Sequence, residues 1–264
     1  MLYSIFSKSY KSMLLLIGIL TLPNILFSQG TANKGESKNA AFLFAYYPKE
    51  GMKSHFENGY KRHLNWHKQK NDNLVWYAWY VASGNRLGLF IDGTFGISFA
   101  DFDNRVDLQG DGADFAQTTA PFVEPEFRSV YILREDLSTG KLLEEWKPST
   151  TVQVHLYVVT IGKEQAFEKL LMDIKEYSNK QTKPPVLTWY RLIDGGENSG
   201  YMLMMPKHSW ADYDSPYNTL SSFIERIYGK EATQHLETLA AMIKSKYSET
   251  WRYREDLSYF PNKE

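Results

Sequence analysis

Hydrophobic and polar positions alternate along some segments of this chain and recur at helical spacing along others. In the second half, residues 151–160 alternate as a strand does, and Phe167, Leu170 and Ile174 then fall on one face of a helix. Two strands, two helical patterns and a last strand follow, over residues 186–193, 201–205, 220–227, 236–243 and 247–254. This half therefore predicts the element order βαββαβ.

The first half gives a similar pattern, with one difference in its second helical region. Strands are predicted over residues 41–47, 74–81, 87–91 and 127–134, and a helix over residues 52–68. Between Asp103 and Pro125 the sequence is rich in Asp, Gly and Thr, which predicts a long loop with at most a short helix. The pattern thus indicates two similar units joined by a linker.

Short sequence matches, in the same order in both halves, support an internal duplication. The pentapeptide Arg-Glu-Asp-Leu-Ser occurs at residues 134–138 and again at 254–258. Trp76-Tyr77 matches Trp189-Tyr190, and residues 100–103 match residues 211–214. Tandem repeats leave this kind of ordered self-similarity. We therefore expect a first repeat over residues 40–137, a linker over 138–149 and a second repeat over 150–264.

The N-terminal segment has the layout of a secretory signal peptide. Lys8 and Lys11 precede an apolar run over residues 13–22, which is too short to span a bilayer, and the small Ser28 suits a cleavage site. We expect a signal peptide over residues 1–28 and a disordered leader over 29–39, with a retained membrane anchor as the alternative. The mature chain is then predicted to be exported, either periplasmic or extracellular.

Composition narrows the classes of partner and of chemistry. Thirty basic and thirty-one acidic side chains leave a net charge of -1, which argues against nucleic acid or an anionic membrane as a partner. The chain has no cysteine, so thiolate metal sites and cysteine nucleophiles are excluded. Motifs for a serine hydrolase, for phosphate binding and for dinucleotide binding are absent from the sequence, and we expect no cofactor.

Two βαββαβ units in one chain, each with an aromatic second strand, resemble a fused pair of ferredoxin-like modules of the dimeric α/β-barrel superfamily. The resemblance implies an α+β fold in which two four-stranded sheets pack face to face and the helices lie outside. It also implies a monomer with an internal pseudo-dimer. Members of that superfamily include cofactor-independent oxygenases, small isomerases and haem-handling enzymes, so fold alone does not choose an activity.

Polar residues on the strands of the second half give the first candidate site. On each of three strands two of them share one side, namely His155 with Tyr157, Trp189 with Arg191, and Arg252 with Arg254. If they converge, Tyr157, Trp189, Arg252 and Arg254 form a pocket for an aromatic or apolar acid. The alternative is that the tryptophan belongs to the core and the arginines are solvated.

Three functions are considered, the first two of which use this pocket. The leading one is an exported protein that binds a small molecule without turnover. The second is a cofactor-independent oxygenase or isomerase, with His155 as general base and Arg191 stabilising an oxyanion. The third is an envelope scaffold that docks another protein.

His63 and His67 are four residues apart on a predicted helix and share one face, as a two-histidine metal site requires. The sequence shows no third ligand nearby, so we expect packing or hydrogen bonding here and assign no metal, with metal binding as the alternative.

An acidic segment follows the third predicted strand, with aspartates at positions 101, 103, 107, 111 and 114. Calcium binding is one interpretation, and turn formation or helix capping is the favoured one, because Asp is a common turn and cap residue.

Overall fold

The structure is a computed structural model that describes residues 37–140, 148–197 and 199–261. The expected signal peptide, most of the expected leader and the middle of the expected linker lie outside the described residues. Among the described helices, none combines the length and the apolar character that a membrane crossing requires.

Eight strands and the helices between them follow the chain in the predicted order. The first half contains β1 (Ala40–Pro48), α1 (Lys53–Gln69), β2 (Tyr77–Ser83), β3 (Phe90–Ile97), α2 (Phe99–Asp103), α3 (Leu108–Thr118) and β4 (Val123–Leu133). The second half contains β5 (Thr151–Val159), α4 (Glu164–Asn179), β6 (Thr188–Asp194), β7 (Gly200–Lys207), α5 (Leu220–Tyr228), α6 (Ala232–Met242) and β8 (Ile243–Tyr253).

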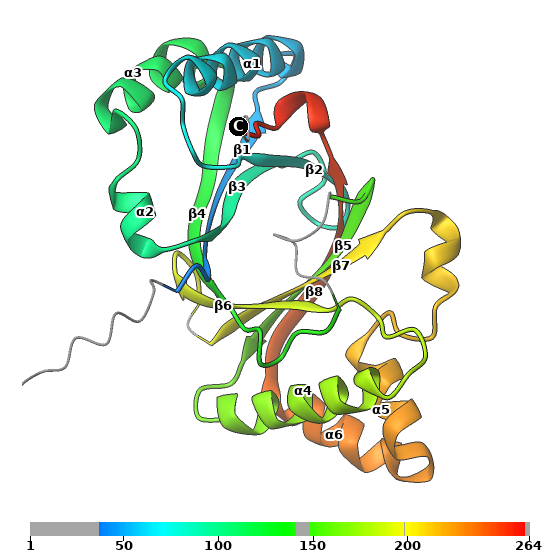
Figure 1. Cartoon of the computed structure of the whole chain (residues 1–264). Coiled ribbons are helices and arrows are strands. Elements are labelled where there is room, and N and C mark those ends of the chain that lie inside the picture. Colours follow the sequence, from blue (N-terminus) through cyan, green and yellow to red (C-terminus); the bar gives the residue numbers. More distant parts are fainter. Residues whose placement is uncertain (1–36, 141–147, 198, 262–264) are drawn as a thin grey trace, which may run out of the picture. The chain divides into compact units, whose positions relative to one another are not determined.

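The strands close into a single barrel with the order β1-β3-β2-β8-β5-β7-β6-β4 (Figure 1). Every neighbouring pair is antiparallel. The first four strands of the chain form one continuous part of the barrel and the last four form the other. The two parts join where β2 pairs with β8 and where β4 pairs with β6. The expected α+β class is therefore confirmed, and the strands form one closed eight-stranded antiparallel barrel where two separate four-stranded sheets were expected.

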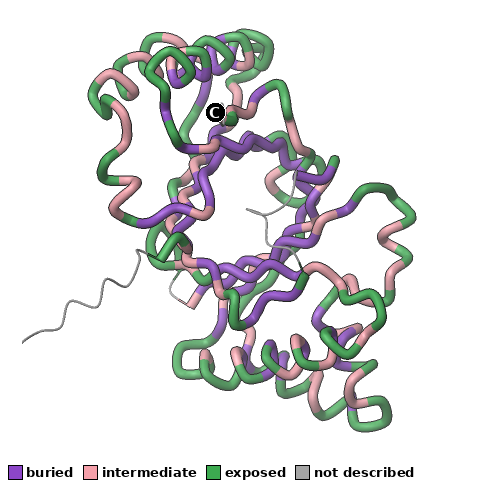
Figure 2. The backbone as a smooth tube through the Cα atoms, viewed as in Figure 1, coloured by how far each residue is buried: buried purple, intermediate pink, exposed green. Residues whose placement is uncertain are grey.

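The helices lie outside the barrel (Figure 1). Successive side chains of a strand point to opposite faces of the sheet, so one set faces the barrel interior and the other faces the helices. The interior is a core that includes Leu43, Trp79, Tyr190 and Trp251, all at most 1% exposed. Two further cores lie on the outer faces, one under α1 and the other under α4, α5 and α6. Figure 2 shows the result, with buried backbone around the barrel and exposed helices outside.

The acidic segment differs from its prediction as a long loop. It contains α2 and the eleven-residue helix α3, neither of which has a buried residue. A helix without a buried apolar stripe leaves no hydrophobic periodicity to detect. The third strand was predicted over residues 87–91, whereas β3 begins at Phe90 and ends at Ile97, so the prediction was wrong at both ends.

Candidate metal centre

Helix α1 carries the two histidines toward the sheet. Phe56 and Tyr60 fix this face of the helix, because both are buried against Phe90 of β3. One and two turns later the same face presents His63 and His67, each 5% exposed. The helical spacing predicted from the sequence therefore aligns the two imidazoles on the buried side of α1.

Asp111 reaches the histidines from α3, a separate helix that packs on α1 (Figure 1). Asp107 starts α3 by accepting a hydrogen bond from the backbone N–H of Gly110. The helices come close at Gly59, where a Cβ atom would lie 2.0 Å from the carbonyl oxygen of Thr118. This close approach lets the carboxylate of Asp111 enter the space beside the imidazoles.

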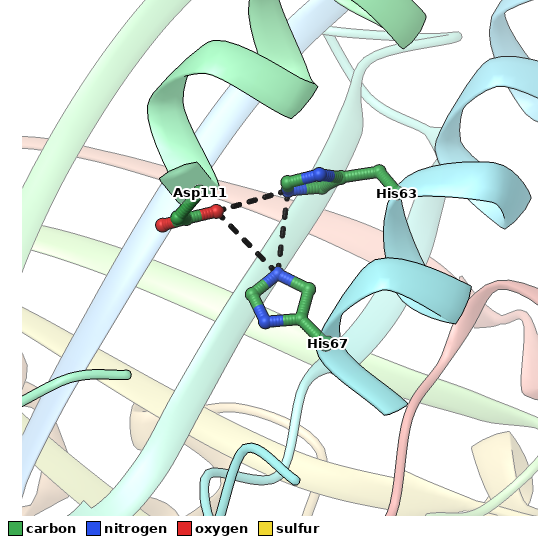
Figure 3. Close-up of side chains that lie close together, drawn as sticks. All are labelled: His63, His67 and Asp111. Carbon is green, nitrogen blue, oxygen red and sulfur yellow. Dashed lines mark hydrogen bonds and ion pairs between the residues drawn. The ribbon is translucent and has the colours of Figure 1, made fainter. Parts of the chain in front are cut away.

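Three potential ligand atoms form a small triangle (Figure 3). The Nε2 atoms of His63 and His67 are 3.3 Å apart, and Oδ1 of Asp111 lies 3.3 Å from the first and 3.6 Å from the second. A cation about 2.1 Å from each of three ligands requires ligand separations of about 3.0 Å in an octahedral site and about 3.4 Å in a tetrahedral site. The observed triangle has nearly these dimensions, so the residues fit a transition-metal ion.

A second carboxylate stands behind each imidazole. Nδ1 of His63 lies 2.8 Å from Oδ1 of Asp114, and Nδ1 of His67 lies 2.8 Å from Oδ2 of Asp72. Trp76 also donates to Asp72 through its indole N–H, at 2.9 Å. Metal-binding histidines commonly donate their other ring N–H to a carboxylate, which fixes the ring and the tautomer. Donation from Nδ1–H in both rings would leave the two Nε2 atoms available to one cation.

Electrostatics at this centre depend on the same carboxylates. Burial disfavours a charge on His63, but its hydrogen bonds with Asp111 and Asp114 outweigh burial and raise the pKa of the imidazole. Burial also disfavours the charged form of Asp72, yet its bonds with His67 and Trp76 hold the pKa of that carboxyl below its usual range. The carboxylates thus stabilise a positive charge at this point. A bound cation can supply that charge, and so can a proton.

A cavity of about 210 Å³ opens beside the triangle. Asp92 lines it and is 6% exposed; Tyr60 donates to its Oδ2 at 2.6 Å, and its buried Oδ1 has no hydrogen-bond partner in the described chain. Burial raises the pKa of Asp92 to about 7. An unpaired buried carboxylate oxygen is costly, so it indicates a place where a ligand or water binds.

The candidate residues of the second half lie in several environments. His155 and Tyr157 line a cavity of about 760 Å³ between the sheet and helices α5 and α6. Trp189 is fully buried beside Tyr157, with ring centroids 5.9 Å apart, and belongs to the core. Arg191 is exposed and is not among the residues that line this cavity.

The remaining two arginines of that prediction also lie apart from the cavity. Arg252 is exposed on β8, and Arg254 binds both carboxylate oxygens of Glu57 on α1, with Asp256 as a second partner. The structure thus brings together His155, Tyr157 and Trp189 but not the three arginines. The roles assigned to these residues stay predictions.

Sequence reasoning found the histidine pair and missed Asp111 as its partner. The helical spacing of Asp111 and Asp114, three residues apart, was the available signal. The segment was predicted as a loop, and this spacing places two residues on one face only in a helix, so the signal was missed. Asp101 and Asp212 bind backbone N–H groups in capping boxes, as the capping interpretation expects.

Comparison with known proteins reaches this chain through structure alone. No family model and no curated protein matches the sequence. A candidate monooxygenase from Lactobacillus acidophilus NCFM is 11% identical, with a TM-score of 0.52 over 84% of this chain and 97% of that one. An anthrone oxidase-like protein is 10% identical, with a TM-score of 0.51 over 86% of this chain and 94% of that one.

A chlorite dismutase from Candidatus Nitrospira defluvii is 8% identical, with a TM-score of 0.52 over 84% of this chain and 94% of that one. These proteins are dimeric α/β-barrel folds, and at such low identity the likeness concerns fold only. The chain has the dimeric α/β-barrel fold.

Proposed function

We propose that this protein is an enzyme that depends on a divalent transition-metal ion held by His63, His67 and Asp111. The observation that carries the proposal is the triangle of ligand atoms, with a carboxylate behind each imidazole. Two imidazoles and one carboxylate suit iron(II), zinc or cobalt(II), whereas calcium and magnesium prefer oxygen ligands alone. This donor set also replaces the calcium interpretation of the acidic segment.

An enzyme is favoured over a structural metal site by the number of ligands. Structural zinc sites usually have four protein ligands, whereas catalytic sites have three and keep a position open. Here the open side faces a cavity that Asp92 also lines. The names of the structural neighbours, an oxidase-like protein, a dismutase and candidate monooxygenases, also favour an enzyme over the non-catalytic binding protein expected from sequence.

The residues of the chain have distinct tasks in this proposal. The cation supplies Lewis acidity to a bound substrate or water. Asp72 and Asp114 orient the two imidazoles, and Tyr60 holds the carboxylate of Asp92 in place through one oxygen. Asp92 also lines the cavity, where its carboxylate would accept a hydrogen bond from a bound molecule.

Metal binding by stripped protein tests the proposal. After chelation, we expect the wild-type chain to bind one Co²⁺ or Zn²⁺, detected by calorimetry and by elemental analysis of dialysed protein. Asp111→Asn and His67→Gln should each weaken binding by at least about tenfold, since ligands matter at least as much as the residues that orient them. His235→Ala is the matched control, because this histidine stacks on Tyr228 outside the centre.

Two results would overturn the proposal. One is wild-type protein that binds no transition metal although circular dichroism reports a folded chain. The other is metal binding that the double variant H63Q/H67Q retains unchanged. Either outcome assigns the cluster to a hydrogen-bond network of the two histidines with Asp72, Asp111 and Asp114.

A second candidate function, binding of a small molecule in the second half, is supported by His155. This side chain lines the cavity of about 760 Å³ and is 7% exposed, and its Nε2 has no hydrogen-bond partner in the part of the chain that the structure describes. A ligand that donates a hydrogen bond to Nε2 would satisfy it. Retention of a small molecule by native protein, and its loss in His155→Phe, would test this function.

We also propose that the two halves arose by duplication of one βαββαβ module. The backbone N–H of Arg134 donates to the carbonyl of Trp189, and that of Arg254 donates to the carbonyl of Ala78. These corresponding bonds support a pseudo-twofold relation. In this relation Trp189 of the second half corresponds to Ala78 of the first half. The expected match of Trp76 with Trp189 is therefore wrong by two residues. Export and a monomeric state stay predictions.

A further inference from the structure

The cavity beside the proposed metal centre contains two arginines that the metal-binding role does not use. Arg105 lies between α2 and α3, Arg128 lies on β4, and both line the cavity with Asp92 and Asp111. With a divalent cation in place, the cation and the two guanidinium groups outweigh the two carboxylates on the cavity wall. The wall is then suited to an anion.

These two guanidinium groups make few hydrogen bonds and ion pairs within the described residues. Arg105 donates through Nε to the carbonyl oxygen of Phe102 at 3.2 Å, and its Nη1 lies 3.6 Å from Oδ2 of Asp111. The carboxylate of Asp111 is shared with the metal in the proposed function, so it does not neutralise Arg105 fully. Arg128 lies over the ring of Phe44 at 5.5 Å and has no ion-pair partner among the residues that the structure describes. Both side chains therefore keep donors available for a ligand.

The size and the remaining walls of the cavity restrict the ligand further. A volume of about 210 Å³ lies below the roughly 300–1,000 Å³ of sites that hold drug-sized ligands, so the ligand is small. Phe44, Phe115 and Leu108 supply apolar surface to the same space. A ligand that fits both properties has one anionic group and a short apolar or aromatic remainder.

We infer that the substrate of this site is a small organic monocarboxylate, bound through Arg105 and Arg128, with its apolar part against Phe44 and Phe115. The inference rests on the proposed function, because it places the substrate beside the metal centre. Each guanidinium group lies over an aromatic ring: that of Arg105 is 4.0 Å from the ring centroid of Phe102, and that of Arg128, an exposed residue, is 5.5 Å from the ring centroid of Phe44. Such stacking orients an arginine so that its remaining N–H groups can bind a carboxylate.

The test uses full-length protein loaded with Co²⁺ and titrated by calorimetry with benzoate and propionate. Benzamide and propionamide are the probes without charge, matched in shape to the two acids. We expect saturable binding of at least one acid, with its amide at least about tenfold weaker, and a change in the visible cobalt spectrum during the titration. Arg128→Gln should weaken binding of that acid by about tenfold or more, the usual effect of losing a hydrogen bond between charged groups.

The controls separate this inference from the proposed function. Arg128→Gln should leave the affinity for Co²⁺ unchanged, and Arg226→Gln on α5 should change neither affinity. If Co²⁺ binds but neither acid does, if amides bind as well as acids, or if Arg128→Gln binds the acid as tightly as wild type, the inference is wrong and the metal centre stands. If Co²⁺ itself does not bind, the proposed function fails and this inference fails with it.

Discussion

His155 should make the stability of the protein depend on pH in a defined window. Burial lowers the pKa of this imidazole from 6.5 to about 4, and a hydrogen bond with the backbone of Asn218 offsets only part of that effect. A histidine with a lowered pKa in the folded state binds more protons when the chain unfolds. The free energy of unfolding should therefore fall as pH drops below about 6.5, and the loss should level off below about 4.

The size of the effect follows from the two pKa values. Between pH 8 and pH 5, proton linkage lowers the free energy of unfolding by about 2 kcal/mol, and the limit below pH 4 is about 3 kcal/mol. Since the side chain is only 7% exposed, solvent screening reduces these values little.

Urea unfolding at pH 8, 7, 6 and 5 measures this linkage. His155→Gln removes the titrating group, so its stability should decline by about 2 kcal/mol less than that of wild type over this range. His208→Gln is the matched control, because this histidine is exposed and its solvation changes little on unfolding. Parallel pH profiles for wild type and His155→Gln would refute the reasoning and would mean that His155 is solvated in the folded protein.

Two further substitutions test contacts that position the fold and the metal centre. Arg254→Ala removes a guanidinium that binds both oxygens of Glu57, at 2.8 and 3.0 Å, and should lower the free energy of unfolding by about 1–3 kcal/mol in urea titrations. Arg62 is exposed, and Arg62→Ala should change the free energy of unfolding by less than about 0.5 kcal/mol. Equal losses in the two variants would show that the contact of Arg254 with Glu57 does not stabilise the fold. Gly59→Ala places a Cβ atom 2.0 Å from the carbonyl oxygen of Thr118. It should cost about 1–3 kcal/mol and weaken Co²⁺ binding by separating α3 from α1; unchanged metal affinity would show that α3 is not positioned there.

The strands and most helices were predictable because each buries one face. Alternation over residues 151–160 corresponds to β5, and the predicted helix over residues 52–68 corresponds to α1. Helix α3 was not predictable by this route because none of its residues is buried. Its start depends instead on Asp107, a cap in the left-handed region with φ 42°. Local hydrogen bonding, which hydrophobic periodicity does not register, specifies this helix.

The proposed metal centre was predictable only in part, for a related reason. The spacing of His63 and His67 is local to one helix and can be read from the sequence. Their contact with Asp111 depends on tertiary packing at Gly59, where the absence of a side chain allows two helices to approach. A glycine inside a predicted helix does not indicate which segment will pack against it.

The two halves fill the same layer of the fold in different ways, and the difference supports a functional cluster. An offset of 111 residues relates the capping box of Ser98 and Asp101 to that of Ser209 and Asp212. The same offset carries Tyr60, His63 and Asp92 onto Leu171, Ile174 and Leu203, each at most 1% exposed. The second half thus closes this layer between helix and sheet with an apolar core. Because the three corresponding positions of the second half are apolar and buried, the costly polar cluster of the first half is better explained by ligand binding than by folding.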